Sequence, residues 1–201
     1  MAGTEETAIV ILAAGASTRM GKPKQLLEIR GETLIQRVCR LALQTGCKPI
    51  VVVLGANERA IKNAMNDLAN LLQFVQNQQW KQGMSTSLRA GIQSLSTYHP
   101  KPKAVLVLLV DQPFVNSELL KQLQQESVSN PTKIVATHYG EVLGVPAIFP
   151  DIYFDRLSQI EGDKGARQVI VQHKDQVVSI PFPKAAFDLD TPEDWEQWGG
   201  G

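Results

Sequence analysis

This sequence has few cysteines and histidines, and neither sign of charge is in excess. Its two cysteines, Cys39 and Cys47, are too few for the disulfide framework of a small secreted protein. Its histidines, His99, His138 and His173, are scattered without the spacing of a zinc site. Lysine plus arginine number 20, and so do aspartate plus glutamate. This balance gives no basic field of the kind that indicates a nucleic acid or an anionic membrane as partner.

Long apolar runs are missing as well. No stretch approaches the roughly 20 apolar residues that cross a bilayer, and residues 8–13 are too short for the core of a signal peptide. We therefore expect a cytoplasmic protein that binds neither membrane nor nucleic acid. With 201 residues, 43% of them hydrophobic, the chain suits one domain over residues 1–201 with one sizeable core. Residues 1–7 and 199–201 are expected to be loose ends.

The most informative stretch is residues 8–24, AIVILAAGASTRMGKPK. Its first part, Ala8–Ala13, is typical of a strand buried on both faces of a parallel sheet. A loop of small residues around Gly15 and Gly21 follows. Glycine allows close backbone approach, and Arg and Lys neutralise oxyanions, so the pattern predicts a phosphate-binding loop. A plain turn with solvated cations is the alternative. The loop carries Ser17 and the cations Arg19, Lys22 and Lys24, of which Lys22, next to Pro23, ranks below Lys24 because a solvated side chain explains it.

Strand-like and helix-like segments alternate along most of the chain, which predicts an α/β fold with a mainly parallel sheet and right-handed crossovers. Ligands of such sheets bind at the carboxyl ends of the strands, which places Gly15, Arg19, Lys24 and Asp111 on one rim. Thr33, Asn57 and Asn116 are expected helix N-caps. We expect strands at residues 8–13, 50–54, 71–75, 104–110, 134–137, 145–149 and 176–180, and helices at 34–45, 58–68, 85–95, 116–127, 165–172 and from Pro192.

Acidic residues far apart in sequence are candidates for one metal site. Asp111 directly follows the apolar run Val105–Val110, and a buried carboxylate is costly without a cation or other partner. Mg2+ is usually held by one or two carboxylates plus phosphate oxygens. Strand-like alternation places Asp188 and Asp190 on the same face, from which one of them can reach the ion. The alternatives are a cap or turn at Asp111, and capping of the last helix by Asp190 or Thr191.

The glycine-bearing loop matches neither of two familiar phosphate loops. Five residues separate Gly15 from Gly21, where a Walker A loop has four, and GxGxxG is absent. Instead, LAAGASTRMGKPKQLL, residues 12–27, resembles the signature of the MobA-like nucleotidyltransferases, which include molybdenum cofactor cytidylyltransferases. The resemblance implies a Rossmann-like three-layer fold with a mainly parallel, mixed-edge sheet. It also implies nucleotide contacts from Leu12, Ala13, Ala14, Gly15, Ser17 and Lys24, with Arg19 and Lys24 acting in catalysis.

Further segments match the same family in order along the chain. LVDQP, residues 109–113, is similar to its metal-binding motif, and DLDTPED, residues 188–194, matches its DxDTPED pattern. The implied metal ligands are Asp111 and Asp190, and Asp111 is also implied as a catalytic and nucleotide-binding residue. WKQGMSTSLRAG, residues 80–91, is similar to the segment that lines the nucleoside pocket, although an ordinary capped helix explains most of it. This last similarity implies contacts from Gly83, Ser85 and Ser87.

Two later segments resemble the acceptor side of the family. GVPAIF, residues 144–149, and GDKGAR, residues 162–167, are similar to its GxPxxF and GDxGAR segments. Many members have His or Asn where this chain has Val145, and the departure removes a polar contact. For GDKGAR the alternative is a helix start with Asp163 as its cap. The nucleotide-binding part would cover about residues 8–115 and the acceptor part about 130–190. The implied acceptor contacts are Gly144, Pro146, Asp163 and Arg167.

The resemblance implies a Mg2+-dependent enzyme that transfers CMP from CTP to molybdopterin and releases pyrophosphate. Guanylyl-transferring relatives tend to have glycine where Ala14 stands, so this position favours the cytidylyl branch. The rivals are another NTP as donor, a sugar- or alditol-phosphate nucleotidyltransferase, and a non-catalytic carrier or chaperone of the cofactor. A molybdoenzyme or its chaperone is the partner that such a product implies, and a monomer or weak homodimer is expected.

Overall fold

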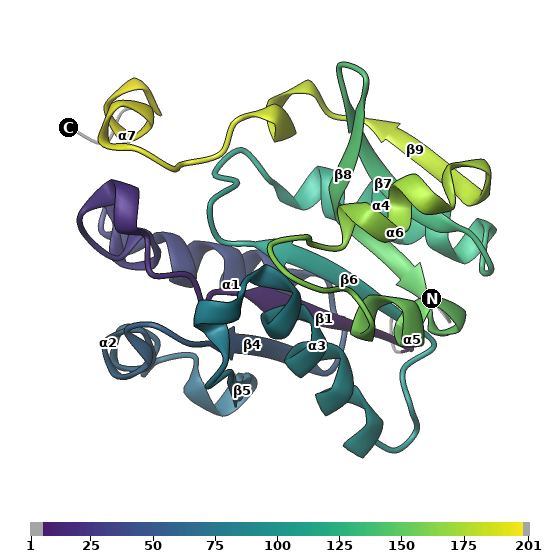
Figure 1. Ribbon diagram of the computed structural model, residues 1–201, viewed down its shortest axis with the longest axis horizontal. Coiled ribbons are helices and arrows are strands. Elements are labelled where there is room, and N and C mark those ends of the chain that lie inside the picture. The colour runs from purple at the N-terminus through teal and green to yellow at the C-terminus, as the bar shows by residue number, and fades with distance from the viewer. Residues whose placement is uncertain (1–5, 199–201) are drawn as a thin grey trace.

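The computed structural model describes residues 6–198, whose main sheet lies between two layers of helices (Figure 1). β8 runs antiparallel to both of its neighbours, whereas the other neighbouring pairs of this sheet are parallel. The arrangement confirms the three-layer α/β fold with a mainly parallel, mixed-edge sheet. From edge to edge the strands are β5 (Gln73–Gln76), β4 (Ile50–Leu54), β1 (Thr7–Leu12), β6 (Ala104–Leu109), β8 (Val142–Pro150), β7 (Ile134–Tyr139) and β9 (Val177–Pro181).

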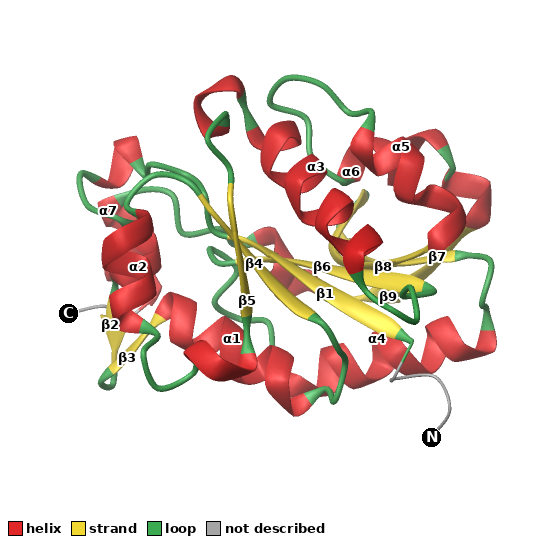
Figure 2. Ribbon diagram, turned by 90° about the horizontal axis from the view of Figure 1, so that it is seen from below, coloured by secondary structure: helices red, strands yellow, loops and turns green. Residues whose placement is uncertain are grey.

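Both faces of the sheet are covered by helices (Figure 2). The strand β1 shows why, because Ile9 and Ile11 point into one apolar cluster, and Val10 and Leu12 into the other. Alternate residues of a strand face opposite sides, so a continuous apolar run requires cover on both. One cluster includes residues of α1 (Leu34–Gln44), α2 (Glu58–Ala64), α4 (Ser117–Ser129) and α7 (Pro192–Trp198), and the other includes residues of α3 (Met84–Ser94), α5 (Phe154–Ser158) and α6 (Arg167–Gln172).

α1, α2 and α4 each begin next to their expected N-cap residue, but a side-chain capping bond forms only at α1 and α4. Thr33 and Gln36 form a reciprocal capping box at the start of α1. The side chain of Asn116 caps α4 as expected. Asn57 precedes α2 in a left-handed conformation with φ of 59°, which Asn tolerates, and its side chain makes no capping hydrogen bond. The helix also ends at Ala64 rather than near residue 68, because the following residues form a separate turn.

Three short elements, β2 (Glu28–Ile29), β3 (Glu32–Thr33) and α5, were not predicted, and β8 is longer than predicted. β2 and β3 form a small hairpin, and both are too short to carry a hydrophobic period. α5 was missed for the same reason. β8 extends beyond residues 145–149 because it pairs with β7 and β6 along its length. Thr7, expected in a loose end, begins β1 and is buried, whereas residues 1–5 and 199–201 lie outside the described residues.

Both cysteines are buried free thiols. Burial raises the pKa of Cys39 to about 12, so this thiol stays protonated and unreactive. Among residues 6–198, no helix has the length and apolar character needed to cross a membrane.

The sheet places the glycine-bearing loop and Asp111 at the same edge. Leu12, the last residue of β1, pairs with Val53 of β4 and Leu109 of β6. The segments after β1 and β6 therefore leave the sheet side by side, at its carboxyl edge. Ligands of open α/β sheets bind at this edge, so a site is expected there.

Candidate active site

Gln25 holds the glycine-bearing loop in shape. Its side-chain amide donates to the carbonyl oxygens of Ala13 at 3.0 Å and Gly15 at 2.8 Å. The hydroxyl of Ser17 accepts from the Lys24 backbone N–H at 3.0 Å and donates to Gln25. Gln25 is almost fully buried, so these bonds are shielded from water. The loop is thereby closed on itself, and the side chain of Lys24 extends from its end toward β6.

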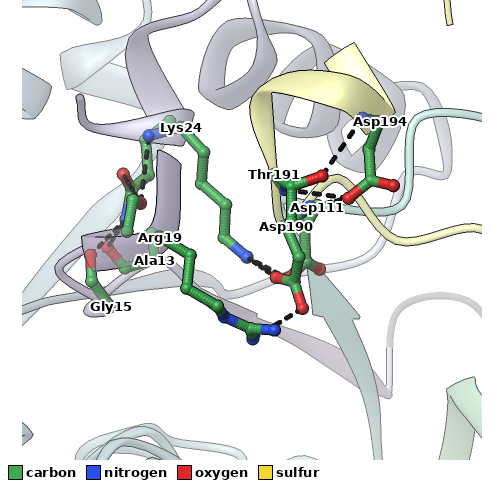
Figure 3. Close-up of polar contacts among 10 residues, drawn as sticks. Ala13, Gly15, Arg19, Lys24, Asp111, Asp190, Thr191 and Asp194 are labelled. Carbon is green, nitrogen blue, oxygen red and sulfur yellow. Dashed lines mark hydrogen bonds and ion pairs between the residues drawn. The ribbon is translucent and has the colours of Figure 1, made fainter. Parts of the chain in front are cut away.

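Lys24 lies between the two candidate metal ligands (Figure 3). Its Nζ is 2.6 Å from Oδ2 of Asp111 and 2.9 Å from Oδ1 of Asp190. Arg19 binds the other oxygen of Asp190 at 2.8 Å. The expected convergence of the loop cations with two acids distant in sequence is therefore present in the fold.

The C-terminal segment reaches this place through its backbone. The N–H of Leu189 donates to the carbonyl oxygen of Asp111 at 2.9 Å, and the Leu189 side chain is fully buried. Thr191 and Asp194 cap α7 reciprocally, since the Thr191 hydroxyl accepts from Asp194 N–H and the Asp194 carboxylate accepts from Thr191 N–H. Thr191 and Asp194 therefore cap α7. The Asp190 carboxylate remains part of the charged cluster formed by Arg19, Lys24, Asp111 and Asp190.

The charges of the cluster shift one another's pKa. Burial disfavours the charged form of Lys24, but Asp111 and Asp190 outweigh it and raise the pKa of Lys24. Partial burial also opposes the charged form of Asp190, but Lys24 and Arg19 lower its pKa. Desolvation, followed by repulsion from Asp111 and Asp190, raises the pKa of Asp188 to about 6. At neutral pH, Asp188 is therefore charged at a cost to the fold.

Replacing Asp188 by Asn should stabilise the protein at high pH only. The folded-state pKa of about 6 lies above the ordinary value of the carboxyl, so this group favours folding below about pH 4 and loses that contribution as the pH rises through 6. Although its carboxyl group is partly desolvated, the residue as a whole is exposed and solvent screens its charge, so we expect a gain of only about 1 kcal/mol at pH 8 that vanishes toward pH 4. Urea unfolding at both pH values measures it, with exposed Asp175→Asn as control. An equal gain at both pH values would contradict the assignment.

The two carboxylates fit a hard divalent cation. Oδ1 of Asp111 is buried and has no hydrogen-bond partner in the described structure, which is costly for a charged oxygen. Asp111 and Asp190 contact the same ammonium, so both can reach one ion. Across residues 6–198, no group of three or more His, Cys, Asp or Glu could hold a metal. The chain would supply two carboxylate ligands, and phosphate oxygens and water would fill the other coordination positions of the ion, as is usual for Mg2+.

A cleft of about 300 Å³ opens beside the cluster and runs along the glycine-bearing loop to the start of α3. Two expected nucleotide contacts are placed elsewhere. The Ser17 hydroxyl is used inside the loop, and Ser85 is buried with its N–H bound to the Gly162 carbonyl. All eight others line the cleft, namely Leu12, Ala13, Ala14, Gly15, Lys24, Gly83, Ser87 and Asp111.

Several residues of the site were not singled out from the sequence. Trp80 and Lys81 line the cleft; they belong to the segment of residues 80–91 that resembles a nucleoside-pocket lining, but were not named as contacts. Asn77 is buried and donates to the hydroxyls of Thr86 at 2.8 Å and Ser87 at 2.9 Å, so it orients a lining residue. A lone Gln or Asn carries no periodic or charge signal, and only the fold reveals what such a side chain holds.

One residue expected at the acceptor lies in the same cleft as the glycine-bearing loop. Asp163 lines it, opposite the start of α3. The approach is close, because a Cβ built on Gly83, which has φ of 109°, would lie 2.5 Å from the carbonyl oxygen of Gly162. Glycine is therefore required at residue 83. The alternative of Asp163 as a helix cap is wrong, since Ala166 holds the N-cap position of α6.

The other acceptor candidates lie apart from this cleft. Gly144 and Pro146 are on β8, and Arg167 begins α6 with its side chain exposed. Gln112 connects β8 to the cluster, because its side-chain amide donates to the Val145 carbonyl at 3.1 Å. The structure therefore does not gather Gly144, Pro146, Asp163 and Arg167 into one surface of the cleft.

Comparison with known proteins indicates the family of the chain. A sequence profile described as the MobA-like NTP transferase domain matches residues 9–177. Nicotine blue oxidoreductase of Paenarthrobacter nicotinovorans is 33% identical over 92% of both chains, and the molybdenum cofactor cytidylyltransferase of Escherichia coli is 25% identical, again over 92% of both. A crystal structure of Rv0371c from Mycobacterium tuberculosis is 28% identical, covers 97% of this chain and 98% of its own, and superposes with a TM-score of 0.80. The chain belongs to the MobA-like NTP transferase family of nucleotidyltransferases.

Proposed function

We propose that this nucleotidyltransferase transfers CMP from CTP to molybdopterin with Mg2+ as its cofactor. The observation that carries the proposal is the position of Lys24 between Asp111 and Asp190, at the rim of the cleft. The E. coli cytidylyltransferase supports the substrate pair by its name. A manganese complex of Rv0371c, 26% identical to this chain, supports a divalent ion.

The reaction needs no protein nucleophile. A phosphate oxygen of the acceptor forms a bond to the α-phosphorus of CTP, the bond from that phosphorus to the bridging oxygen breaks, and pyrophosphate leaves with the electron pair. Asp111 and Asp190 would hold Mg2+, which neutralises charge on phosphate oxygens when bound. Lys24 and Arg19 would stabilise the charge that develops on the non-bridging oxygens. The backbone around Gly15 would lie against the triphosphate.

Pyrophosphate release tests this proposal directly. The protein is incubated with molybdopterin and each of the four NTPs, with and without Mg2+, and the products are identified by mass. We expect release with CTP and Mg2+ together with a cytidylylated cofactor. Binding of the cofactor without release would favour a carrier, and turnover only with a sugar or alditol phosphate would replace the acceptor. Reduction of nicotine blue without nucleotidyl transfer would place the chain with its oxidoreductase relative.

Ala14 offers a test of the choice of base. Its side chain is 3% exposed and lines the cleft. Gly55 leaves room for this methyl group, because a Cβ built on Gly55 would lie only 2.9 Å from it. We expect Ala14→Gly to raise the GTP-to-CTP ratio of kcat/KM by about tenfold, which corresponds to about 1.4 kcal/mol of lost steric conflict. An unchanged ratio would count against the role of this methyl group.

A further inference from the structure

The two carboxylates of the charged cluster, Asp111 and Asp190, already bind cations of the protein itself. Three of the four oxygens of Asp111 and Asp190 are bound by Lys24 or Arg19. The remaining oxygen, Oδ1 of Asp111, is buried. A divalent ion that binds both carboxylates therefore has to share or take oxygens that Lys24 holds at 2.6 and 2.9 Å.

The two cations of the cluster differ in how firmly they hold these oxygens. The side chains of Lys24 and Asp111 are 16% and 18% exposed, whereas that of Arg19 is 71% exposed. Exposed ion pairs are screened by water and contribute little, so Arg19 is a weak competitor. Lys24 is shielded, and leaving it without a counter-charge is costly. A metal ion alone offers Lys24 no new partner, but a triphosphate does.

We propose that Lys24 excludes a lone divalent cation from Asp111 and Asp190. Its ammonium group releases these carboxylates only when a triphosphate binds it instead. In this exchange the ammonium keeps its proton and changes partners, from carboxylate to phosphate oxygens. Metal and nucleotide then bind cooperatively, because each raises the affinity of the site for the other. The proposal rests on the proposed function, since it assigns the triphosphate as the second partner of Lys24.

Binding of Mn2+ to the free enzyme tests the exclusion, with electron paramagnetic resonance to count unbound Mn2+. We expect Lys24→Met to bind Mn2+ at least about tenfold more tightly than the wild type in the absence of nucleotide, because the competing charge is gone. Lys22→Met, which removes an exposed lysine two positions away, should match the wild type. After correction for the Mn2+ that CTP binds without protein, CTP should tighten Mn2+ binding to the wild type at least about tenfold and to Lys24→Met much less. Equal or weaker Mn2+ binding by Lys24→Met would overturn the proposal.

Amine labelling of the wild type covers the case in which Lys24→Met fails to fold. Acetylation of Lys24, read by mass spectrometry with Lys22 as the internal reference, should be slow in the free enzyme and slow with Mn2+ and CTP together. It should be fastest with Mn2+ at a concentration high enough to displace the ammonium, and unchanged labelling there would overturn the exclusion.

Pyrophosphate release by the wild type separates the two proposals. Turnover without competition between Lys24 and Mn2+ for the carboxylates would reject only the exclusion of the lone metal ion. Such competition without turnover on any NTP would reject only the proposed function.

Discussion

Asp111→Ala should abolish nucleotidyl transfer while the protein stays folded. The substitution removes the buried oxygen that has no hydrogen-bond partner in the described structure, and with it the better shielded of the two carboxylates proposed to hold Mg2+. We expect kcat to fall at least about a thousandfold, which corresponds to about 4 kcal/mol of lost transition-state stabilisation. Initial rates of pyrophosphate release with saturating CTP and Mg2+ measure the loss.

The fold should survive because Lys24 keeps Asp190 as its counter-charge, at 2.9 Å. Leu189 also keeps its bond to residue 111, since the acceptor is a backbone carbonyl. Far-ultraviolet circular dichroism and urea unfolding would verify this. Asp175→Ala removes an exposed aspartate in a turn outside the cluster and should leave the rate unchanged. A rate of Asp111→Ala near that of the wild type would refute the metal assignment.

Lys24→Ala should have the next largest effect on turnover. Lys24 is the most shielded cation of the cluster, and fixed positive charge in a partly dry site lowers the barrier to phosphoryl transfer. We expect a cost of about 2–4 kcal/mol, or about 30- to 1000-fold in kcat/KM. Steady-state rates at several CTP concentrations divide this loss between kcat and KM.

Lys22 provides the matched control for Lys24. It belongs to the same loop but is exposed. Lys22→Ala should change kcat/KM by less than about threefold, as expected for a solvated charge. If Lys24→Ala were slowed by less than about tenfold, Lys24 would not contact the developing charge.

Sequence patterns predicted the parts of the fold that depend on local or repeated signals. The apolar runs of β1, β4 and β6 identified the central strands, and Thr33 and Asn116 identified two helix starts. Such signals are strong because each strand is buried on both faces and each cap is a single local bond. The rule that ligands bind at the carboxyl edge then placed the loop cations near Asp111.

The remaining parts depend on contacts between distant segments. The sequence offered Asp188 and Asp190 on one face, and only the backbone bond from Leu189 to Asp111 shows how this segment is held beside the end of β6. The hairpin of β7 and β8 is likewise defined by pairing. Gln25, which shapes the loop, carries no charge or period by which it could be found.

A crystal structure with CTP and Mn2+ tests the central claim most directly, because the anomalous signal of manganese locates the ion without assumption. The account predicts one ion bound by both Asp111 and Asp190, the triphosphate along the loop around Gly15, and Lys24 on phosphate oxygens. Manganese bound away from these carboxylates, or Lys24 still between them with CTP in the cleft, would contradict it.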